Sequence, residues 1–227
     1  MSHVEVGTAL SLPGAALAEL VARHLDFVWV DLEHGALGPA EMQDAIVGIQ
    51  AAGARAHVRV GSAMATAPAL DAGADGIVFP RVTGPETAGA AVAALHHPPA
   101  GRRGYGPRRE AVRERHGLPA CTLQIEDAAG VEAAEAIASV PGVDAVVVGA
   151  ADLSFALGVP LELDSPALQA AIAAVRQAAA RAGTRFGIAG LPPARAVACG
   201  AELVLHGSDV RLIDSTFERL VKEVVDA

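Results

Sequence analysis

The sequence predicts an α/β protein whose single domain, residues 1–227, is a (β/α)₈ TIM barrel. Three observations predict this fold: the length, the alternation of short apolar runs with Ala-rich stretches, and the lack of a linker. The 227 residues are close to the roughly 250 typical of such a barrel. Alternating strands and helices imply parallel strands joined by crossover helices. A doubly wound open sheet is the alternative, but no G-x-G-x-x-G or P-loop motif supports it.

Eight strands are expected, each a short run rich in β-branched and other apolar residues. They span residues 4–12, 27–33, 54–60, 76–82, 120–126, 144–150, 185–190 and 202–208. The helical stretches between and after them span residues 14–23, 39–51, 66–73, 85–95, 128–139, 165–182, 192–199 and 209–225. Pro39, Pro85 and Pro166 stand in first helical turns, where proline is favoured. Gly53 and Gly183 follow helical runs, as C-terminal caps do.

Composition and charge exclude several classes of function. Hydrophobic residues make up 52% of the chain and charged residues 19%, which is typical of a globular protein. Lys plus Arg is 17 and Asp plus Glu is 26, so the net charge is −9. An acidic chain without a basic run is not expected to bind nucleic acid. The Arg-rich stretch 102–115 is interrupted by two glutamates, and we interpret it as a loop or short helix beside a site for anions.

A cytoplasmic location is expected, with no membrane partner. The N-terminal segment lacks a basic region and a long apolar core, so no signal peptide is expected. No apolar run approaches the ~20 residues that are needed to cross a bilayer. Cys121 and Cys199 fit neither a zinc spacing nor a disulfide framework.

The lysine content limits the chemistry. The only lysine is Lys222, five residues before the end of the sequence. A mechanism that forms a Schiff base on a lysine inside the barrel therefore has no residue to use. No G-x-S-x-G motif is present either, so nucleophilic acyl transfer is not supported.

Polar residues gather at the expected carboxyl ends of the strands, where the active site of such a barrel lies. These residues are Asp31, His34, Arg59, Arg81, Gln124, Glu126, Asp152 and His206. Their clustering at one end of an otherwise apolar barrel is the main functional signal of the sequence.

Glu126 and Asp152 are the candidate metal ligands. Two carboxylates from neighbouring strand ends can bind one hard cation and leave positions for water and substrate oxygens. Gln124 lies on the same strand face as Glu126, because residues i and i+2 point the same way. The alternative for each carboxylate is a helix cap or a charge in a first helical turn.

A turn of small residues enters a helix after the sixth strand. It consists of Gly149, Ala150, Ala151 and Asp152. Its backbone N–H groups are suited to a carboxylate or phosphate, although many such turns are small for packing reasons alone.

His34 is a candidate general base, or a proton relay through water. The alternative is a structural histidine. Arg59 ends a buried strand, so it either pairs with a structural carboxylate or faces the barrel mouth and holds an anionic substrate. Asp71 is a candidate partner for His34, or else an ordinary helix residue.

Several runs of the sequence resemble the HpcH/HpaI family of class II aldolases. They are WVDLEHG at 29–35, ALDAGADGIVFPRV at 69–82, PPAGRRGYG at 98–106, LQIEDAAG at 123–130, GAADLS at 149–154 and GIAG at 187–190. The resemblance covers most of the chain in order, and its most specific part runs from the fifth strand to GAADLS. It implies a (β/α)₈ barrel, a homo-oligomer (a hexamer built as a trimer of dimers, with C-terminal helices swapped), and one divalent ion, Mg²⁺, Mn²⁺ or Co²⁺, which stabilises a pyruvate enolate.

Carried over by position, the resemblance implies roles for the candidate residues. Glu126 and Asp152 become the metal ligands, and Gln124 becomes a substrate contact or a support for the ligands. Arg59 binds the pyruvyl oxygens, while the 149–152 turn holds the substrate carboxylate. His34 acts in acid–base catalysis, paired with Asp71, with Asp31 supporting that network.

The implied reaction is the cleavage or formation of a 4-hydroxy-2-oxo acid from pyruvate, or a similar 2-oxo acid, and an aldehyde. Two alternatives keep the same site: an oxaloacetate-type decarboxylase and a citrate-lyase-like C–C lyase. A third is a barrel without catalytic activity. The residues leave the acceptor aldehyde and the preferred metal open.

Overall fold

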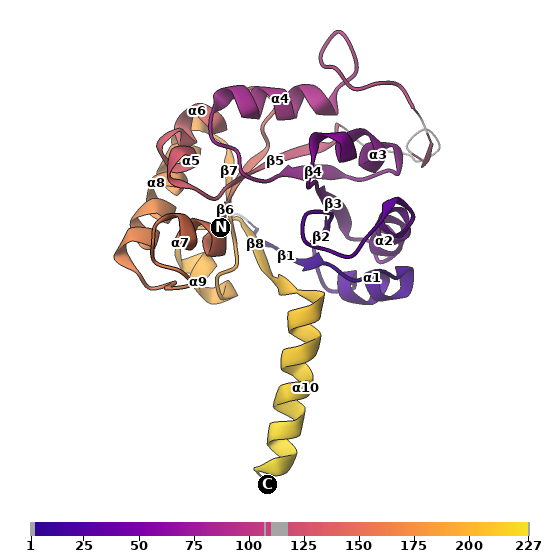
Figure 1. The fold of residues 1–227 in the computed structure, drawn as a ribbon, viewed down its shortest axis with the longest axis vertical. Coiled ribbons are helices and arrows are strands. Elements are labelled where there is room, and N and C mark those ends of the chain that lie inside the picture. Colours follow the sequence, from indigo (N-terminus) through magenta and orange to yellow (C-terminus); the bar gives the residue numbers. More distant parts are fainter. Residues whose placement is uncertain (1–2, 107, 110–117, 227) are drawn as a thin grey trace.

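The chain forms a closed parallel barrel of eight strands in the computed structural model, which describes residues 3–106, 108–109 and 118–226 (Figure 1). The strands are β1 (Glu5–Leu10), β2 (Phe27–Asp31), β3 (Arg55–Arg59), β4 (Gly76–Phe79), β5 (Ala120–Ile125), β6 (Ala145–Gly149), β7 (Arg185–Ala189) and β8 (Leu203–Ser208). Each strand pairs with its neighbours in sequence, and β8 returns to pair with β1. The predicted (β/α)₈ barrel is confirmed, and the open sheet is excluded.

Helices follow the strands around the outside of the barrel. They are α1 (Ala15–Ala22), α2 (Pro39–Ala51), α3 (Thr66–Asp71), α4 (Pro85–Leu95), α5 (Ala128–Glu132), α6 (Ala134–Ala138), α7 (Ala150–Ala156), α8 (Pro166–Ala182), α9 (Pro193–Ala198) and α10 (Asp209–Val225). A 3₁₀ turn at Ala63–Ala65 precedes α3. The single helix expected at 128–139 is two short helices that meet at Ala133.

The strands are shorter than expected at their carboxyl ends, for local reasons. β2 stops at Asp31 because the N–H groups of Glu33 and His34 donate to the Asp31 carboxylate instead of to a neighbouring strand. β4 stops at Phe79 because the next residue, Pro80, has no N–H to donate. In a longer strand, successive side chains would point to opposite faces of the sheet. Because β2 and β4 stop early, the side chains that follow them gather at the barrel mouth.

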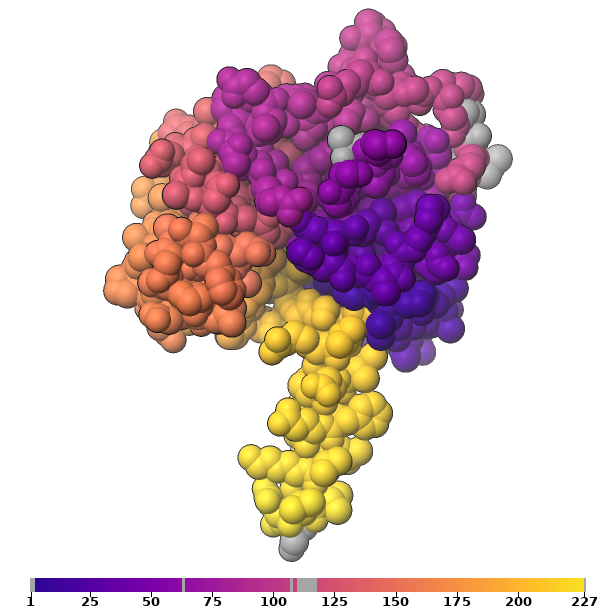
Figure 2. All heavy atoms as spheres, viewed as in Figure 1, coloured from indigo at the N-terminus to yellow at the C-terminus, as the bar shows by residue number. Residues whose placement is uncertain are grey.

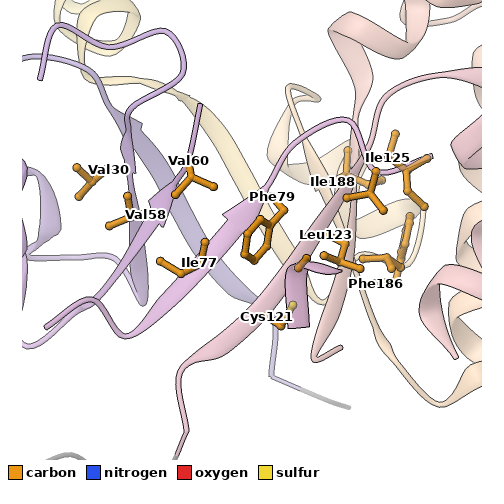
Figure 3. Packing of buried hydrophobic residues seen from close by; sticks show 14 of the residues in the cluster. Val30, Val58, Val60, Ile77, Phe79, Cys121, Leu123, Ile125, Phe186 and Ile188 are labelled. Atoms are coloured by element: carbon orange, nitrogen blue, oxygen red, sulfur yellow. The ribbon is translucent and has the colours of Figure 1, made fainter. Parts of the chain in front are cut away.

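Two apolar layers make the core. The larger one lies between the strands and the helices, and Figure 3 shows part of it, with Val58, Ile77 and Leu123 among the labelled side chains. The smaller layer fills the barrel interior and includes Phe27, Trp29 and Val147. Because successive strand residues point to opposite faces, alternate positions supply the two layers.

The barrel is closed by pairing of the first and last strands. β1 and β8 are parallel neighbours, with Val6 opposite Val204. Asp209, at the start of α10 and 1% exposed, adds a side-chain link, because its carboxylate accepts hydrogen bonds from the N–H groups of Ser11 (3.0 Å) and Leu12 (2.9 Å). The loop after β1 is thus attached to the beginning of the last helix.

The last helix, α10, projects away from the barrel as a single arm (Figures 1 and 2). Among its residues only Asp209 is buried, while large apolar side chains along it are exposed. No helix in the described ranges is long and apolar enough to cross a membrane. The arm is therefore a helix without a partner in its own chain.

Candidate active site

Two adjoining cavities open at the carboxyl ends of the strands. The first, which we call the mouth cavity, has a volume of about 310 Å³. Its lining includes Asp31, His34, Arg59, Gln124, Gly149, Ala150, Ala151, Asp152, Gly190, Ser208 and Arg211. The second, which we call the carboxylate cavity, has a volume of about 160 Å³ and is lined by Glu33, His34, Arg81, Glu126, Asp127 and Asp152. His34 and Asp152 border both, so the two cavities form one site.

The Glu126 carboxylate is fixed from two sides. Gln124 Nε2 donates to its Oε1 at 2.6 Å, and the backbone N–H of Arg81 donates to its Oε2 at 3.1 Å. The Gln124 contact confirms that these two residues share one face of the strand. Burial raises the pKa of Glu126 to about 7, and the negative charges of Asp152 and Glu33 add to the effect. A buried carboxylate beside other negative charges favours the binding of a proton or a cation, and Glu126 is such a group.

The residues around Glu126 fit a hard divalent cation. Glu126 and Asp152 line the same small cavity, and two carboxylates completed by water and substrate oxygens suit Mg²⁺ or Mn²⁺. The buried Oε1 of Gln124 finds no hydrogen-bond partner among the described residues, so a bound donor such as water is needed there. The described residues contain no group of three or more His, Cys, Asp or Glu side chains that could hold a metal ion.

Gly149 allows this arrangement because it lacks a side chain. A Cβ atom at this position would lie 2.5 Å from Glu126 Oε1 and 2.8 Å from Gln124 Nε2. No real Cβ atom approaches neighbours so closely, so any other residue would displace the Glu126–Gln124 pair. Gly149, which was predicted to belong to a carboxylate-binding turn, thus also makes room for Glu126, a candidate metal ligand.

Arg59 both pairs with a carboxylate and lines the mouth cavity, so the structural pairing does not remove it from the mouth. It donates from Nε to Asp31 Oδ1 at 3.0 Å and from Nη2 to Asp31 Oδ2 at 2.6 Å. Burial alone would raise the pKa of Asp31, but the Arg59 guanidinium outweighs burial and holds that pKa below its usual range. Glu33 lies 3.6 Å from Arg59 Nε and also pairs with Arg81.

The side chain of His34 is exposed at the edge of both cavities. Its imidazole ring is 64% exposed, and its Nε2 lies 3.9 Å from the Glu33 carboxylate. Its backbone N–H donates to Asp31 Oδ1 at 3.2 Å, so the carboxylate that holds Arg59 also fixes the turn that carries His34. The ring is free to meet a substrate from the mouth.

The 149–152 turn lines the mouth cavity. The side chain of Ala150, the first residue of α7, is fully buried in the outer core layer. Ala151 and Asp152 remain exposed at the start of α7. Asp152 lies in the first helical turn, as the capping alternative expected, but the N-cap itself is Gly149.

Asp71 has a different partner from the predicted one. Its carboxylate accepts a hydrogen bond from Arg103 Nη2 at 2.6 Å, and it lines neither cavity of the site. The expected Asp71–His34 pair is not found among the described residues of this chain. The physical reason is that Arg103 is only 5% exposed, and a buried guanidinium needs a carboxylate nearby.

Several residues of the site were not singled out by the sequence. Arg81 was noted only as a strand end. Ser208, the last residue of β8, and Arg211, in the first turn of α10, border the mouth cavity. Their position at or after strand ends was the one signal available for them. The part of the Arg-rich stretch at 107 and 110–117 lies outside the described residues, so the anion site expected beside it stays a prediction.

Comparison with known proteins identifies this arrangement. A family model described as HpcH/HpaI aldolase/citrate lyase matches residues 11–213. The chain belongs to the HpcH/HpaI aldolase/citrate lyase family. It is 36% identical to a hydroxypyruvate/pyruvate aldolase of Rhizorhabdus wittichii over 79% of this chain and 76% of that protein. It is 33% identical to a 4-hydroxy-2-oxovalerate aldolase of Rhodococcus jostii, over 93% and 88% of the two chains.

Solved structures agree with this assignment. An HpcH/HpaI aldolase/citrate lyase family protein from Burkholderia cenocepacia superimposes with a TM-score of 0.91 at 30% identity, covering 98% of this chain and 95% of that one. The resemblance inferred from the sequence is therefore confirmed, and this HpcH/HpaI family member is a carbon–carbon lyase of the aldolase type. The family generally depends on a divalent metal ion, which agrees with the donor set around Glu126.

Proposed function

We propose that this aldolase cleaves a 4-hydroxy-2-oxo acid into pyruvate, or a similar 2-oxo acid, and an aldehyde. The observation that carries the proposal is the meeting in one mouth of two carboxylates, Glu126 and Asp152, with the half-buried Arg59 and the exposed His34. The names of the relatives, which include pyruvate and 4-hydroxy-2-oxovalerate aldolases, support the same substrate class.

Glu126 and Asp152 would hold one divalent ion, Mg²⁺, Mn²⁺ or Co²⁺. When bound, such an ion supplies Lewis acidity at the 2-oxo group. The substrate carboxylate would lie against the backbone of the 149–152 turn. Arg59 has N–H groups beyond the two that Asp31 accepts, and these would donate to the oxygen on C2.

The chain's own side chains would then guide the cleavage. His34 accepts the proton of the 4-hydroxyl group while the bond between C3 and C4 breaks. The electron pair of that bond moves between C2 and C3, and negative charge develops on the C2 oxygen beside Arg59. The aldehyde leaves with C4, and C3 takes up a proton to complete the 2-oxo acid.

The test is pyruvate release from a racemic 4-hydroxy-2-oxo acid, with Mn²⁺ or Mg²⁺ and again after EDTA. Wild type, Glu126→Gln and Glu135→Gln are compared. Glu135 is the matched control, since the same change removes its exposed ion pair with Arg181, 2.7 Å away, and Glu135 lines neither cavity. We expect metal-dependent release that Glu126→Gln loses and Glu135→Gln keeps.

Other outcomes identify the alternatives. Turnover of oxaloacetate without cleavage of the hydroxy-oxo acid would make the protein a decarboxylase that uses the same site. Cleavage of a citryl thioester into oxaloacetate and an acetyl thioester would make it a citrate-lyase-like enzyme. No turnover of any of these compounds, with the fold intact, would leave a barrel without catalytic activity.

We further propose that α10 docks on a second copy of the chain. Its exposed apolar residues include Ile213, Phe217, Leu220 and Val224, which recur every three or four positions and so form one stripe. Polar residues such as Ser215 and Lys222 occupy the opposite side of the helix. An apolar stripe of this length on an isolated arm is typical of an obligate interface, which supports the homo-oligomer, a hexamer by resemblance, that the sequence predicts.

A further inference from the structure

Arg81 has an unusual backbone conformation at the edge of the carboxylate cavity. Its φ angle is +52°, and among the described residues other than glycine only Leu161 shares a positive φ. This left-handed region is unfavourable for a side chain larger than glycine, asparagine or aspartate. Such conformations cluster at functional sites, where the surrounding structure holds them in place.

The chain around Arg81 shows what the turn accomplishes. Pro80 has no N–H, and Val82 resumes the ladder by donating to Gln124 O at 3.0 Å. Between them, the N–H of Arg81 leaves the ladder and donates to Glu126 Oε2 at 3.1 Å. The left-handed residue thus turns one backbone donor out of the sheet and toward a buried carboxylate.

This donor completes the fixation of Glu126. The other carboxylate oxygen, Oε1, accepts from Gln124 Nε2 at 2.6 Å. The two donors come from different strand ends, so together they fix both the position and the plane of the carboxylate. Glu126 is 6% exposed, and its remaining lone pairs face the cavity that it shares with Asp152.

The side chain of Arg81 has a separate interaction. Its Nη1 pairs with Glu33 Oε1, and the side chain is 62% exposed. The Glu33 side chain is only 7% exposed and also lies 3.6 Å from Arg59 Nε. Two substitutions that both remove the guanidinium lose this pair equally, so a difference between them reports the backbone contact.

We propose that Arg81 is a positioning residue whose left-handed backbone directs its N–H at Glu126 and so presets this carboxylate for the divalent cation. The inference rests on the proposed metal site and adds a residue to it. It assigns the effect to the peptide group and not to the guanidinium.

The test compares two variants that both remove the guanidinium. Arg81→Asn introduces a residue that tolerates the left-handed region, whereas Arg81→Val introduces a β-branched residue that does not. Mn²⁺ binding to the full chain is measured by electron paramagnetic resonance of the free ion. We expect Arg81→Asn to bind Mn²⁺ within about twofold of wild type and Arg81→Val to bind it about tenfold more weakly.

Three results would count against specific parts of this scheme. Wild type that binds no Mn²⁺ would overturn the proposed metal site itself. Wild-type binding with equal affinity in both variants, or equal losses in both, would overturn the role of the Arg81 backbone while leaving the metal site standing. If Arg81→Val does not fold, as judged by circular dichroism, Arg81→Ala replaces it, with an expected loss of about fivefold relative to Arg81→Asn.

Discussion

Asp31 and Arg59 are register partners on neighbouring strands, and the carboxylate accepts two hydrogen bonds from the guanidinium, at 3.0 and 2.6 Å. Such a two-point contact fixes the plane of the guanidinium as well as its position. The same carboxylate accepts the N–H of His34. One aspartate therefore orients the Arg59 guanidinium and fixes the backbone that carries His34.

Asp31→Asn is expected to lower kcat/KM for pyruvate release by roughly 10- to 100-fold, because Arg59 loses its fixed plane. Steady-state kinetics with saturating Mn²⁺ measure this. Asp26→Asn is the matched control, since Asp26 also accepts a backbone N–H, from Val6 at 2.8 Å, but lies before β2 at the opposite end of the barrel. Wild-type kinetics in Asp31→Asn would show that Arg59 needs no such support.

Gly149→Ala is expected to abolish Mn²⁺ binding and pyruvate release, because the new methyl group would displace Glu126 and Gln124. Gly89→Ala makes the same change inside α4, where nothing lies within 4 Å of the added atom. That control should keep full activity and gain roughly 0.5–1 kcal/mol of stability. Metal titration of both variants separates the outcomes, and normal Mn²⁺ affinity in Gly149→Ala would contradict the cation site at Glu126.

Asp71→Asn is expected to lower the free energy of unfolding without lowering kcat, the rate at saturating substrate. The change weakens the hydrogen bond to the buried Arg103, which should cost roughly 2 kcal/mol of unfolding free energy. Urea denaturation and kcat are measured together. Glu135→Gln, which breaks the exposed Arg181–Glu135 pair, should cost less than about 1 kcal/mol. A large loss of kcat in Asp71→Asn would instead restore the predicted link to His34.

His57 is expected to make stability fall in acid. Burial, together with the nearby Arg55 charge, lowers the pKa of His57 from 6.5 to about 4 in the folded protein. Between pH 6.5 and pH 4 the imidazole is protonated in the unfolded chain but neutral in the folded one. The stability present above pH 6.5 is therefore lost as the pH falls toward 4. From pH 7 to pH 5 the loss is about 2 kcal/mol.

His57→Gln removes this titration. Urea denaturation at the two pH values should show that the variant loses about 2 kcal/mol less than wild type over the same interval. Identical losses in the two proteins would mean that the pKa of His57 in the folded barrel does not differ from its pKa in the unfolded chain.

Phe217→Glu in α10 is expected to convert the oligomer to a monomer of 22.9 kDa, because a charge on the apolar stripe opposes burial. Ser215→Glu adds the same charge on the polar side of the helix and should leave the assembly intact. Analytical ultracentrifugation distinguishes these states. A monomeric wild type would contradict the proposed role of α10.

Strand order and most site residues could be predicted because they depend on local patterns. Alternating apolar runs specify where strands begin, and the barrel rule places the polar residues that follow them, such as Glu126 and Asp152, at one mouth. His34, Arg59 and Gln124 were found at that mouth for the same reason. Their catalytic and metal-binding roles stay predictions.

Pairings that depend on distant segments could not be predicted. Asp71 lies on a helix end, and its partner Arg103 comes from an irregular stretch 32 residues later, whose path no periodicity specifies. The left-handed conformation of Arg81 could not be predicted either, because arginine has no preference for it. The exact end of β2 depends on the Asp31 carboxylate, which accepts the N–H groups that follow it, and the end of β4 depends on Pro80, which has no N–H.

The link between Asp209 and the loop after β1 joins groups 198 positions apart in the sequence. On the ribosome, the first strand and its loop emerge long before their partners in β8 and α10 exist. Until then one edge of β1 has no strand beside it, and the N–H groups of Ser11 and Leu12 must be satisfied by water. Closure of this barrel therefore waits for the synthesis of β8, and a nascent chain stalled before residue 203 would expose an open sheet edge to chaperones and proteases.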